Sequence, residues 1–268
     1  MNHLQPLVID WAYWWPWLHA LLPLAIFMIL GWLWSVYKHN VHGVDVMWAG
    51  YIFLTAFYVA LQQSLTHPRL WLVLLLAGLW GGRLSLHLAV RNWGQPEDHR
   101  YRSIRANNSP HFWLKSLYII FGLQLLLAWV IALPLVAAVQ SPADINFLDW
   151  LGGVLVLAGI SFEAVADQQL SQFRSQPENK GQVLDTGLWA WSRHPNYFGE
   201  ALTWWGFYLL ALAAGAWWSV LSPLLVTLLL LKVSGVSLTE KTIHERRPAY
   251  ADYIKRTSAF IPWPPKPR

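Results

Sequence analysis

A short polar stretch in the second half of the chain, SRHPNYFGEALTWW, stands directly before a run rich in tryptophan, leucine and alanine. Arg193 and His194 precede Pro195, and Asn196 and Glu200 follow it at helical spacing. Proline fixes the backbone angle of a first helical residue and lacks an amide hydrogen there, so we expect a helix to begin at Pro195. The free amide groups at that helix end would suit a phosphate group.

The helix expected before this stretch carries a second polar set. Glu163, Asp167 and Arg174 follow one another at intervals of four and seven residues, which places them near one helical face. Carboxylates at membrane depth indicate function by default, although a structural ion pair that docks two helices is an open alternative. The two sets predict a cavity at the cytoplasmic mouth of the membrane, of the kind that a phosphorylated nucleotide cofactor would need.

The elements that must position these residues are membrane helices. The chain has 268 residues, of which 56% are hydrophobic, 12% are charged and 20 are tryptophan, and it contains no cysteine. We therefore expect an all-α, polytopic integral membrane bundle of about seven transmembrane helices in one domain, residues 1–268. Apolar windows predict the spans near residues 15–37, 44–65, 70–90, 112–138, 147–170, 198–213 and 217–236.

The orientation follows from the basic residues. Outside the predicted spans, nearly all Lys and Arg residues fall on one side, and only Arg69 falls on the other. The positive-inside rule then places the N-terminus outside and the C-terminal tail in the cytoplasm. The N-terminal segment lacks the basic region and cleavage site of a signal peptide, so we expect it to stay uncleaved. No Walker A motif is present, and we expect no nucleic-acid partner.

Segments along most of the chain resemble the steroid 5-alpha-reductase family, and in particular its bacterial relatives in the DUF1295 group. In the second half these are ADQQLSQFRSQPENKGQVLDTG, GLWAWSRHPNYFGEALTWWGFYL and RRPAYADYIKRTSAFIPW; in the first half they are HGVDVMWAGYIFL, WGGRLSLHLAVRN and EDHRYRSIR. The same superfamily contains sterol reductases and isoprenylcysteine carboxyl methyltransferases, which share an Arg-His-Pro-x-Tyr-x-Gly core.

The resemblance implies a function. It implies an NADPH-dependent reductase of the carbon–carbon double bond in a 3-oxo-4-ene steroid or a similar lipid enone, with hydride added to the beta carbon and a proton to the alpha carbon. It also implies a multi-pass protein of the bacterial inner membrane that acts as a monomer and takes its lipophilic substrate from membrane lipid. Residues 1–138 would form the substrate side, and residues 147–268 the cofactor half.

The resemblance also implies roles for residues. The expected cofactor ligands are Arg100, Arg102, Arg105, Glu163, Asp167, Arg174, Trp189, Arg193, His194, Asn196, Tyr197, Glu200, Glu240 and Arg256. The expected substrate contacts are Trp48, Tyr51 and Trp80, and no metal is expected.

The acid that polarises the substrate ketone is a Glu–Tyr pair in the family. Asp45 falls near the Glu position, while the Tyr position falls on or near Trp80, which cannot deliver a proton. We therefore expect either that Asp45 acts through another group, such as Tyr51, Tyr58 or Tyr101, or that the substrate differs. Asp45 and Tyr101 are the expected catalytic residues. A helix-capping role for Asp45 is the alternative.

Two other classes of function stay open. The first is an S-adenosylmethionine-dependent membrane methyltransferase of the isoprenylcysteine carboxyl methyltransferase type, which would share the RHPNYFG segment. The second is a membrane protein without enzymatic activity, such as a lipid binder or a heme-linked partner. The histidines lack paired axial-ligand spacing, which weighs against heme.

Overall fold

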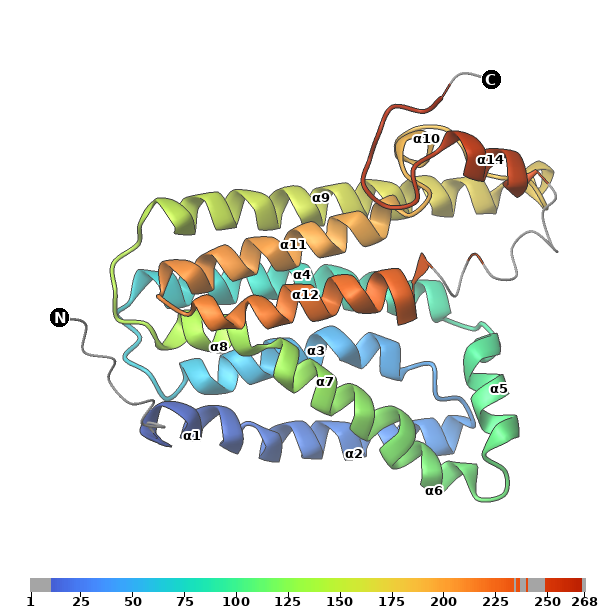
Figure 1. Cartoon of the computed structure of the whole chain (residues 1–268). Helices are drawn as coiled ribbons and strands as arrows, with labels where there is room; N and C mark the ends of the chain where they lie inside the picture. Colours follow the sequence, from blue (N-terminus) through green and yellow to red (C-terminus); the bar gives the residue numbers. More distant parts are fainter. Residues whose placement is uncertain (1–10, 234, 237–239, 241–248, 267–268) are drawn as a thin grey trace. The chain divides into compact units, whose positions relative to one another are not determined.

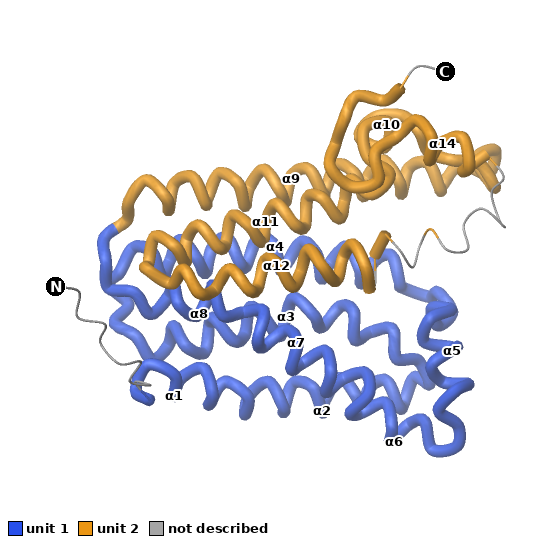
Figure 2. Tube along the Cα trace, in the orientation of Figure 1, with its two compact units in different colours: residues 1–144 blue, residues 145–268 orange. Residues whose placement is uncertain are grey.

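The computed structural model describes residues 11–233, 235–236, 240 and 249–266. Their regular structure is helical, and an isolated bridge joins Ser192 and Ser258. The chain forms two compact units, unit 1 from Met1 to Asp144 and unit 2 from Ile145 to Arg268 (Figure 2). The all-α prediction is confirmed for this part of the chain. The boundary between the units, after Asp144, lies in the interval between the predicted halves, residues 1–138 and 147–268.

Unit 1 is a bundle of apolar helices with one short polar helix, α5, at one end (Figure 1). Its helices are α1 Trp11–His19, α2 Leu21–Lys38, α3 Val44–Ala60, α4 Pro68–Asn92, α5 His99–Asn107, α6 Phe112–Ser116, the π-helix Leu117–Gly122, α7 Leu123–Ile131 and α8 Leu133–Gln140. The predicted span 112–138 is therefore divided. Pro134 at the start of α8 cannot continue the hydrogen bonding of α7, which separates the two helices.

The core of unit 1 is formed where α3 packs against α4, α7 and α8. Two contacts hold helix ends in unit 1: one joins α1 to α7, and the other joins the first turn of α4 to the segment that follows α8. Trp17 and Trp129 stack with ring centroids 3.7 Å apart, and each indole nitrogen donates to the other residue's carbonyl. Arg69 is fully buried and donates to the carbonyls of Ala143 and Asp144. Both contacts satisfy polar groups that would be costly to bury alone.

Unit 2 consists of three helical rods and a small C-terminal cluster (Figure 1). Its helices are α9 Phe147–Ser175, the short 3₁₀ turn Pro177–Asn179, α10 Leu188–Trp191, α11 Pro195–Ala213, the 3₁₀ turn Trp217–Val220, α12 Leu221–Leu228, the π-helix Leu229–Val233 and α14 Tyr250–Arg256. The predicted start of a helix at Pro195 is confirmed. A turn connects α11 to the helices that follow, with Gly215 at a φ of +84°, a conformation that favours glycine.

Helices α9 and α11 lie antiparallel and approach each other at glycines. Gly152 and Gly159 of α9 face Gly206 and Gly199 of α11, so that backbone meets backbone. A methyl group added at Gly159 would lie 2.7 Å from the Gly199 carbonyl oxygen and 2.6 Å from the Thr203 nitrogen. Small residues at a helix interface permit such an approach, and membrane helices use it to associate. This contact sets the register of the polar residues on both helices.

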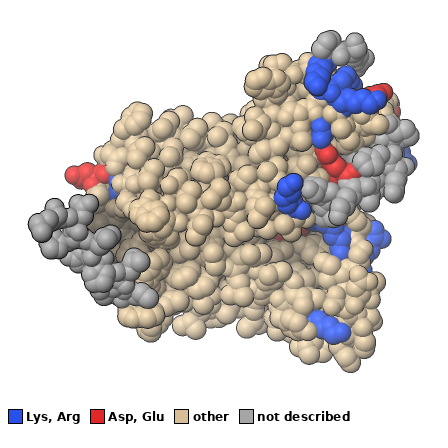
Figure 3. Space-filling model, viewed as in Figure 1, with Lys and Arg blue, Asp and Glu red and all other residues tan. Residues whose placement is uncertain are grey.

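Four helices of the described chain are long and apolar enough to cross a membrane. They are Trp11–Lys38, Pro68–Asn92, Phe112–Ile131 and Phe147–Ser175, and Val44–Ala60 and Trp217–Val233 are shorter apolar helices. Visible Lys and Arg side chains gather toward α5 in unit 1 and toward α14 in unit 2, and long stretches of the visible helices carry none (Figure 3). This distribution is typical of a membrane protein, while seven spans and their orientation stay predictions.

The glycine contact between α9 and α11 predicts the effect of a small substitution. Gly159→Ala should lower the free energy of unfolding by about 1–3 kcal/mol, because the helices would have to move apart. Thermal unfolding of the detergent-purified chain measures this. The matched control is Gly82→Ala in α4, where an added methyl group meets nothing within 4 Å. Equal stability of the two variants would contradict the close contact.

Candidate functional site

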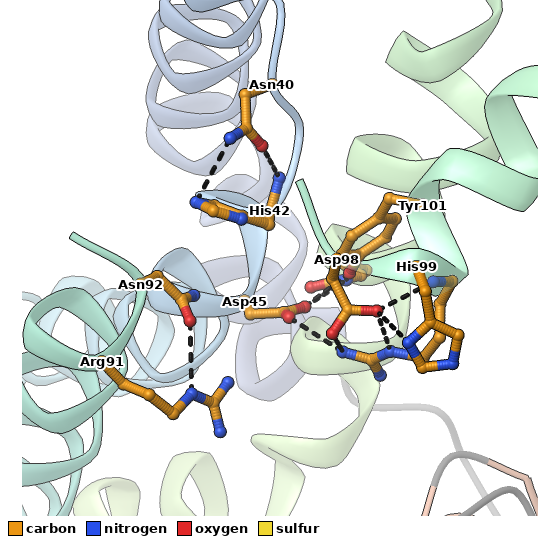
Figure 4. Close-up of polar contacts among 10 residues, drawn as sticks. Asn40, His42, Asp45, Arg91, Asn92, Asp98, His99 and Tyr101 are labelled. Atoms are coloured by element: carbon orange, nitrogen blue, oxygen red, sulfur yellow. Dashed lines mark hydrogen bonds and ion pairs between the residues drawn. The ribbon is translucent and has the colours of Figure 1, made fainter. Parts of the chain in front are cut away.

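In unit 1, Asp45 lies in the first turn of α3 and faces donors from other helices. The Tyr101 hydroxyl donates to Asp45 Oδ1 at 2.5 Å, and Arg100 Nη2 lies 3.4 Å from Oδ2. Gln124 Nε2 lies 3.2 Å from the Tyr101 oxygen and 3.5 Å from Asp45 Oδ1. Figure 4 shows the Asp45 and Tyr101 side chains pointing toward each other. The N-cap of α3 is Gly43 without a side-chain bond, so Asp45 orients a tyrosine and does not cap the helix.

The surroundings keep this tyrosine protonated. Burial raises the pKa of Tyr101, and the negative charge and hydrogen bond of Asp45 raise it further, well above its usual range. Asp98, the N-cap of α5, accepts from the backbone and side chain of Arg100 at 2.8 and 3.0 Å. Burial raises the pKa of Asp98, but the hydrogen bonds and charge of Arg100 outweigh it and lower that pKa. Arg100 therefore stays charged between two carboxylates.

The structure distinguishes the three tyrosines that the sequence offered as partners of Asp45. Tyr101 contacts Asp45, whereas the fully buried Tyr51 directs its hydroxyl toward the Met47 sulfur at 4.0 Å. The backbone carbonyl of Tyr58 accepts a hydrogen bond from Gln62 Nε2 at 3.4 Å. Of the other expected substrate residues, Trp80 is fully buried in α4 and Trp48 is half-buried in α3.

The basic residues of α5 have different surroundings. Arg105 forms a bidentate pair with Glu97, with Nε and Nη2 at 3.0 and 2.8 Å from its two oxygens. Burial raises the pKa of Glu97, but the bonds from Arg105 and from the Val41 amide outweigh it, so that pKa is lowered. Arg102 is exposed. Of the three arginines expected to bind cofactor phosphate, two are therefore paired with carboxylates.

In unit 2, the polar residues of α9 and α11 meet across the glycine contact. Asn196 Nδ2 donates to Asp167 Oδ1 at 3.3 Å, and Glu163 lies opposite Gly199. Glu163 and Asp167 are buried, but Arg174 is exposed. Because α11 begins beside Asp167, the last turn of α9 extends past it, and Arg174 is exposed there.

Arg193 connects the start of α11 to the C-terminal segment. Its Nε and Nη2 donate to the two carboxylate oxygens of Glu240 at 2.7 and 3.1 Å. Nη1 donates to the carbonyls of Thr257 and Ile254 at 2.5 and 3.3 Å, and the backbone amide donates to Ser258 at 2.8 Å. We call this set the Arg193 clamp. Most of the donors of the guanidinium are engaged within the protein.

Glu240 is the centre of the charges in the Arg193 clamp. Besides Arg193, it lies 3.1 Å from His194 Nε2 and 3.4 Å from the Tyr250 hydroxyl. Burial raises the pKa of Glu240, but the bonds and charges of His194 and Arg193 outweigh it and lower that pKa to about 2. The His194 ring stacks in parallel on Tyr197, with centroids 5.3 Å apart. The carboxylate is therefore ionised at neutral pH and holds both residues.

The remaining expected cofactor residues of unit 2 lie beside the clamp or in α11. Trp189 donates from its ring to the Ala166 carbonyl at 3.0 Å, and its own carbonyl accepts from the Tyr253 hydroxyl. Arg256 pairs with Asp185 at 3.3 Å on the wall of an open pocket of about 880 Å³. Glu200, on α11, is buried and accepts from Trp204 within the same helix at 3.1 Å.

Comparison with known proteins places this chain in a family. The family model described as "Protein of unknown function (DUF1295)" matches residues 31–257. The chain belongs to the DUF1295 family. An uncharacterized protein of the fission yeast Schizosaccharomyces pombe is 28% identical over 273 residues, which cover 89% of this chain and 78% of that protein. No solved structure matches.

The sequence of this DUF1295 protein gave no reason to connect Gln124 with Asp45. A single glutamine in the apolar run FGLQLLLAW was the available signal, because a polar group there needs a partner. The π-helix Leu117–Gly122 directly precedes α7 and sets the direction of Gln124, and such π segments are frequent at functional sites. Glu97, Asp98 and Asp185 were also missed, because each acts through a partner that the fold brings close.

The ionised state of Glu240 in this DUF1295 protein predicts a pH-dependent stability. Glu240→Gln should lower the melting temperature near neutral pH by roughly 2–4 °C, the effect of about 1 kcal/mol in a chain of this size, after allowance for solvent screening. Because the pKa of Glu240 is lowered in the folded state from 4.5 to about 2, its stabilising contribution is complete above pH 4.5 and is lost as pH falls toward 2.

Melting curves of the wild type and Glu240→Gln between pH 7 and pH 3 test this prediction. The difference between them should shrink below about pH 4.5. Asp252→Asn is the control, because Asp252 forms an exposed pair with Lys255 and should matter little at any pH. A difference that stays constant down to pH 3 would contradict the assignment.

Proposed function

We propose that this DUF1295 protein is an NADPH-dependent membrane reductase of a carbon–carbon double bond in a lipid enone, such as a 3-oxo-4-ene steroid. The observation that carries the proposal is the Asp45–Tyr101 pair, at 2.5 Å. The buried phenol directs its single O–H at a carboxylate, and it becomes a donor to a substrate carbonyl when that O–H changes acceptor. The resemblance to steroid 5-alpha-reductases supplies the reaction class, in which a Glu–Tyr pair performs this task.

The donor group consists of three side chains with separate tasks. The single O–H of Tyr101, which donates to Asp45 in the structure, would turn to the ketone oxygen when substrate binds, where negative charge develops as hydride reaches the beta carbon. Asp45 holds the phenol before substrate binds, and Gln124 donates to the phenol oxygen beside the same carboxylate. Because burial and Asp45 raise the pKa of Tyr101, the phenol remains a neutral donor. When bound, NADPH would supply the hydride.

The polar residues of unit 2 fit a cofactor that bears an amide and phosphates. Asn196 donates its amide nitrogen to Asp167, and within the described residues its carbonyl oxygen accepts no hydrogen bond. That oxygen suits the carboxamide of a nicotinamide. Arg174 is an exposed cation at the end of α9 and suits a phosphate. We propose cofactor contacts for Arg174 and Asn196 and a supporting position for Asp167.

We assign the Arg193 clamp to holding the C-terminal segment. Its guanidinium already meets Glu240 and two carbonyls, and Glu240 in turn meets His194. The clamp would keep the first turn of α11, and with it Asn196, in a fixed position for the cofactor. Trp189 and Tyr253 would support the same turn from α10 and α14.

The placement in the membrane is part of the proposal. We propose seven spans, an outside N-terminus and a cytoplasmic C-terminus in a bacterial inner membrane. The apolar helices and the concentration of Lys and Arg toward α5 and α14 within their units support it. A lipophilic substrate would then enter from the membrane, and a soluble cofactor from the cytoplasm.

Ligand-dependent stability tests the cofactor. NADPH should raise the melting temperature of the purified chain in detergent, while NADH and S-adenosylmethionine should have smaller effects. Arg174→Ala should weaken NADPH binding roughly tenfold or more, because a charged hydrogen bond is worth about 1.5–3 kcal/mol. Lys180→Ala, which removes another exposed cation of unit 2, is the control. Stabilisation by S-adenosylmethionine alone would refute the reductase and favour the methyltransferase.

Substitutions at the donor pair test the chemistry. Tyr101→Phe should lower the reduction rate of a 3-oxo-4-ene steroid by roughly 10²-fold or more, the scale of losing one oxyanion donor, and leave NADPH binding intact. Asp45→Asn removes the carboxylate that holds the phenol, and should also lower the rate with NADPH binding intact. NADPH oxidation measures the rate. Tyr37→Phe, at an exposed position of α2, is the control. A wild-type rate in Tyr101→Phe would remove this pair from the mechanism.

A further inference from the structure

An open pocket of about 660 Å³ lies within unit 1, and Asp45 is not among the residues that line it. It is bounded by the end of α2 at Val36, by His39, by Arg105 and Ser109, and by Phe112 and Trp113 of α6. Buried Val41 and Phe112 belong to a larger apolar cluster beneath it. The lining therefore combines apolar and aromatic side chains with a guanidinium, an imidazole and serine hydroxyls.

Arg105 presents donors to this pocket. Its Nε and Nη2 bind Glu97, and Nη2 also meets the His39 carbonyl at 3.3 Å. The guanidinium lies 4.4 Å above the centre of the Phe112 ring. In the part of the chain that the structure describes, its Nη1 makes no hydrogen bond, which leaves two N–H donors on a fixed, planar group. An oxyanion is the natural acceptor for such a group.

The surroundings of the pocket indicate that it opens at a membrane interface. It lies at the ends of two helices that are long and apolar enough to span a membrane, Trp11–Lys38 and Phe112–Ile131. Trp34, Tyr37 and Trp113 are 61%, 71% and 51% exposed there. Lys38 Nζ lies 4.9 and 5.2 Å from the Trp34 and Tyr37 rings. Exposed Trp and Tyr beside basic residues are typical of the headgroup level.

An apolar stripe on α2 leads from the bilayer to this pocket. Ile26, Leu30 and Leu33 are 62%, 61% and 50% exposed, and their helical spacing continues to Tyr37, next to the pocket residue Val36. A molecule that follows this stripe has hydrocarbon chains, and one that meets Arg105 carries an acidic oxygen. Free phosphate would bind Arg105 but would have no use for the apolar stripe of α2.

We propose that this pocket binds the phosphate of a membrane phospholipid, with the headgroup at Arg105 and the acyl chains along the exposed stripe of α2. Arg105 lines the pocket, Lys38 and Lys115 lie next to lining residues, and Glu97 neutralises part of the charge of Arg105. Anionic lipid headgroups favour such basic sites between membrane helices. The site is independent of the proposed reductase activity, and its test does not use that activity.

Native mass spectrometry of the whole chain in detergent tests the site. The probes are dioleoylphosphatidylglycerol, dioleoylglycerol, which has the same chains without the phosphate, and inorganic phosphate. The wild type should retain one phosphatidylglycerol with at least tenfold preference over dioleoylglycerol. Arg105→Lys keeps a cation beside Glu97 but removes the Nη1 donors, and should weaken binding roughly tenfold. Arg102→Lys, at an exposed position of the same helix, should bind as the wild type does.

A second variant fills the pocket and leaves the Arg105–Glu97 pair untouched. Val36→Trp should abolish the bound lipid, whereas Leu22→Trp, at a 64% exposed position at the other end of α2, should not. If Arg105→Lys does not fold, Val36→Trp still tests whether the pocket binds the lipid. Equal lipid binding in Val36→Trp and the wild type would overturn the proposal. Displacement of the lipid by millimolar inorganic phosphate, or by NADPH, would also overturn it and would assign Arg105 to a soluble phosphate.

Discussion

A polar group that leaves water inside an apolar helix bundle must find a partner, and this constraint shapes both units of the protein. An unpaired carboxylate or guanidinium in such surroundings costs several kcal/mol. Asp45 is accordingly joined to Tyr101, Arg100 and Gln124. Arg69 and Arg193 are satisfied largely by carbonyl oxygens and, for Arg193, by Glu240. Each pairing connects segments far apart in the chain, so each one fixes how the helices pack.

The same pairings define which residues stay available for chemistry. Arg193 and Glu240 satisfy each other, which makes them parts of the framework. Asn196 is bonded on one side only, and the Tyr101 hydroxyl has a defined direction and a single O–H that a ligand oxygen can accept in place of Asp45. A group that is held in place yet retains bonding capacity is what a binding site requires. In each unit, the framework residues lie next to such a group.

In unit 2, close contact between helix backbones positions the polar side chains, whereas in unit 1 pairing between side chains does so. The glycines of α9 and α11 bring the helices so near that Glu163 and Asp167 face the first turn of α11. Larger residues at these positions would separate the helices and leave the carboxylates without their neighbours. In unit 1 the backbone also contributes, because the π-helix directly before α7 directs Gln124 toward Tyr101.

The sequence by itself determined where the helices lie and which family the chain belongs to. Hydrophobic runs of helical length, Pro195 and the turn at Gly215 act locally, because they depend on the backbone of a few consecutive residues. Pro134 also indicates a helix boundary within the predicted span 112–138, but the prediction did not divide the span there. Only the tertiary structure decided that Asp45 meets Tyr101 and not Tyr51, that Arg193 meets Glu240, and that Arg174 extends beyond α11. These outcomes depend on contacts between residues tens of positions apart, whose distances are set by the packing of whole helices, and no local pattern encodes them.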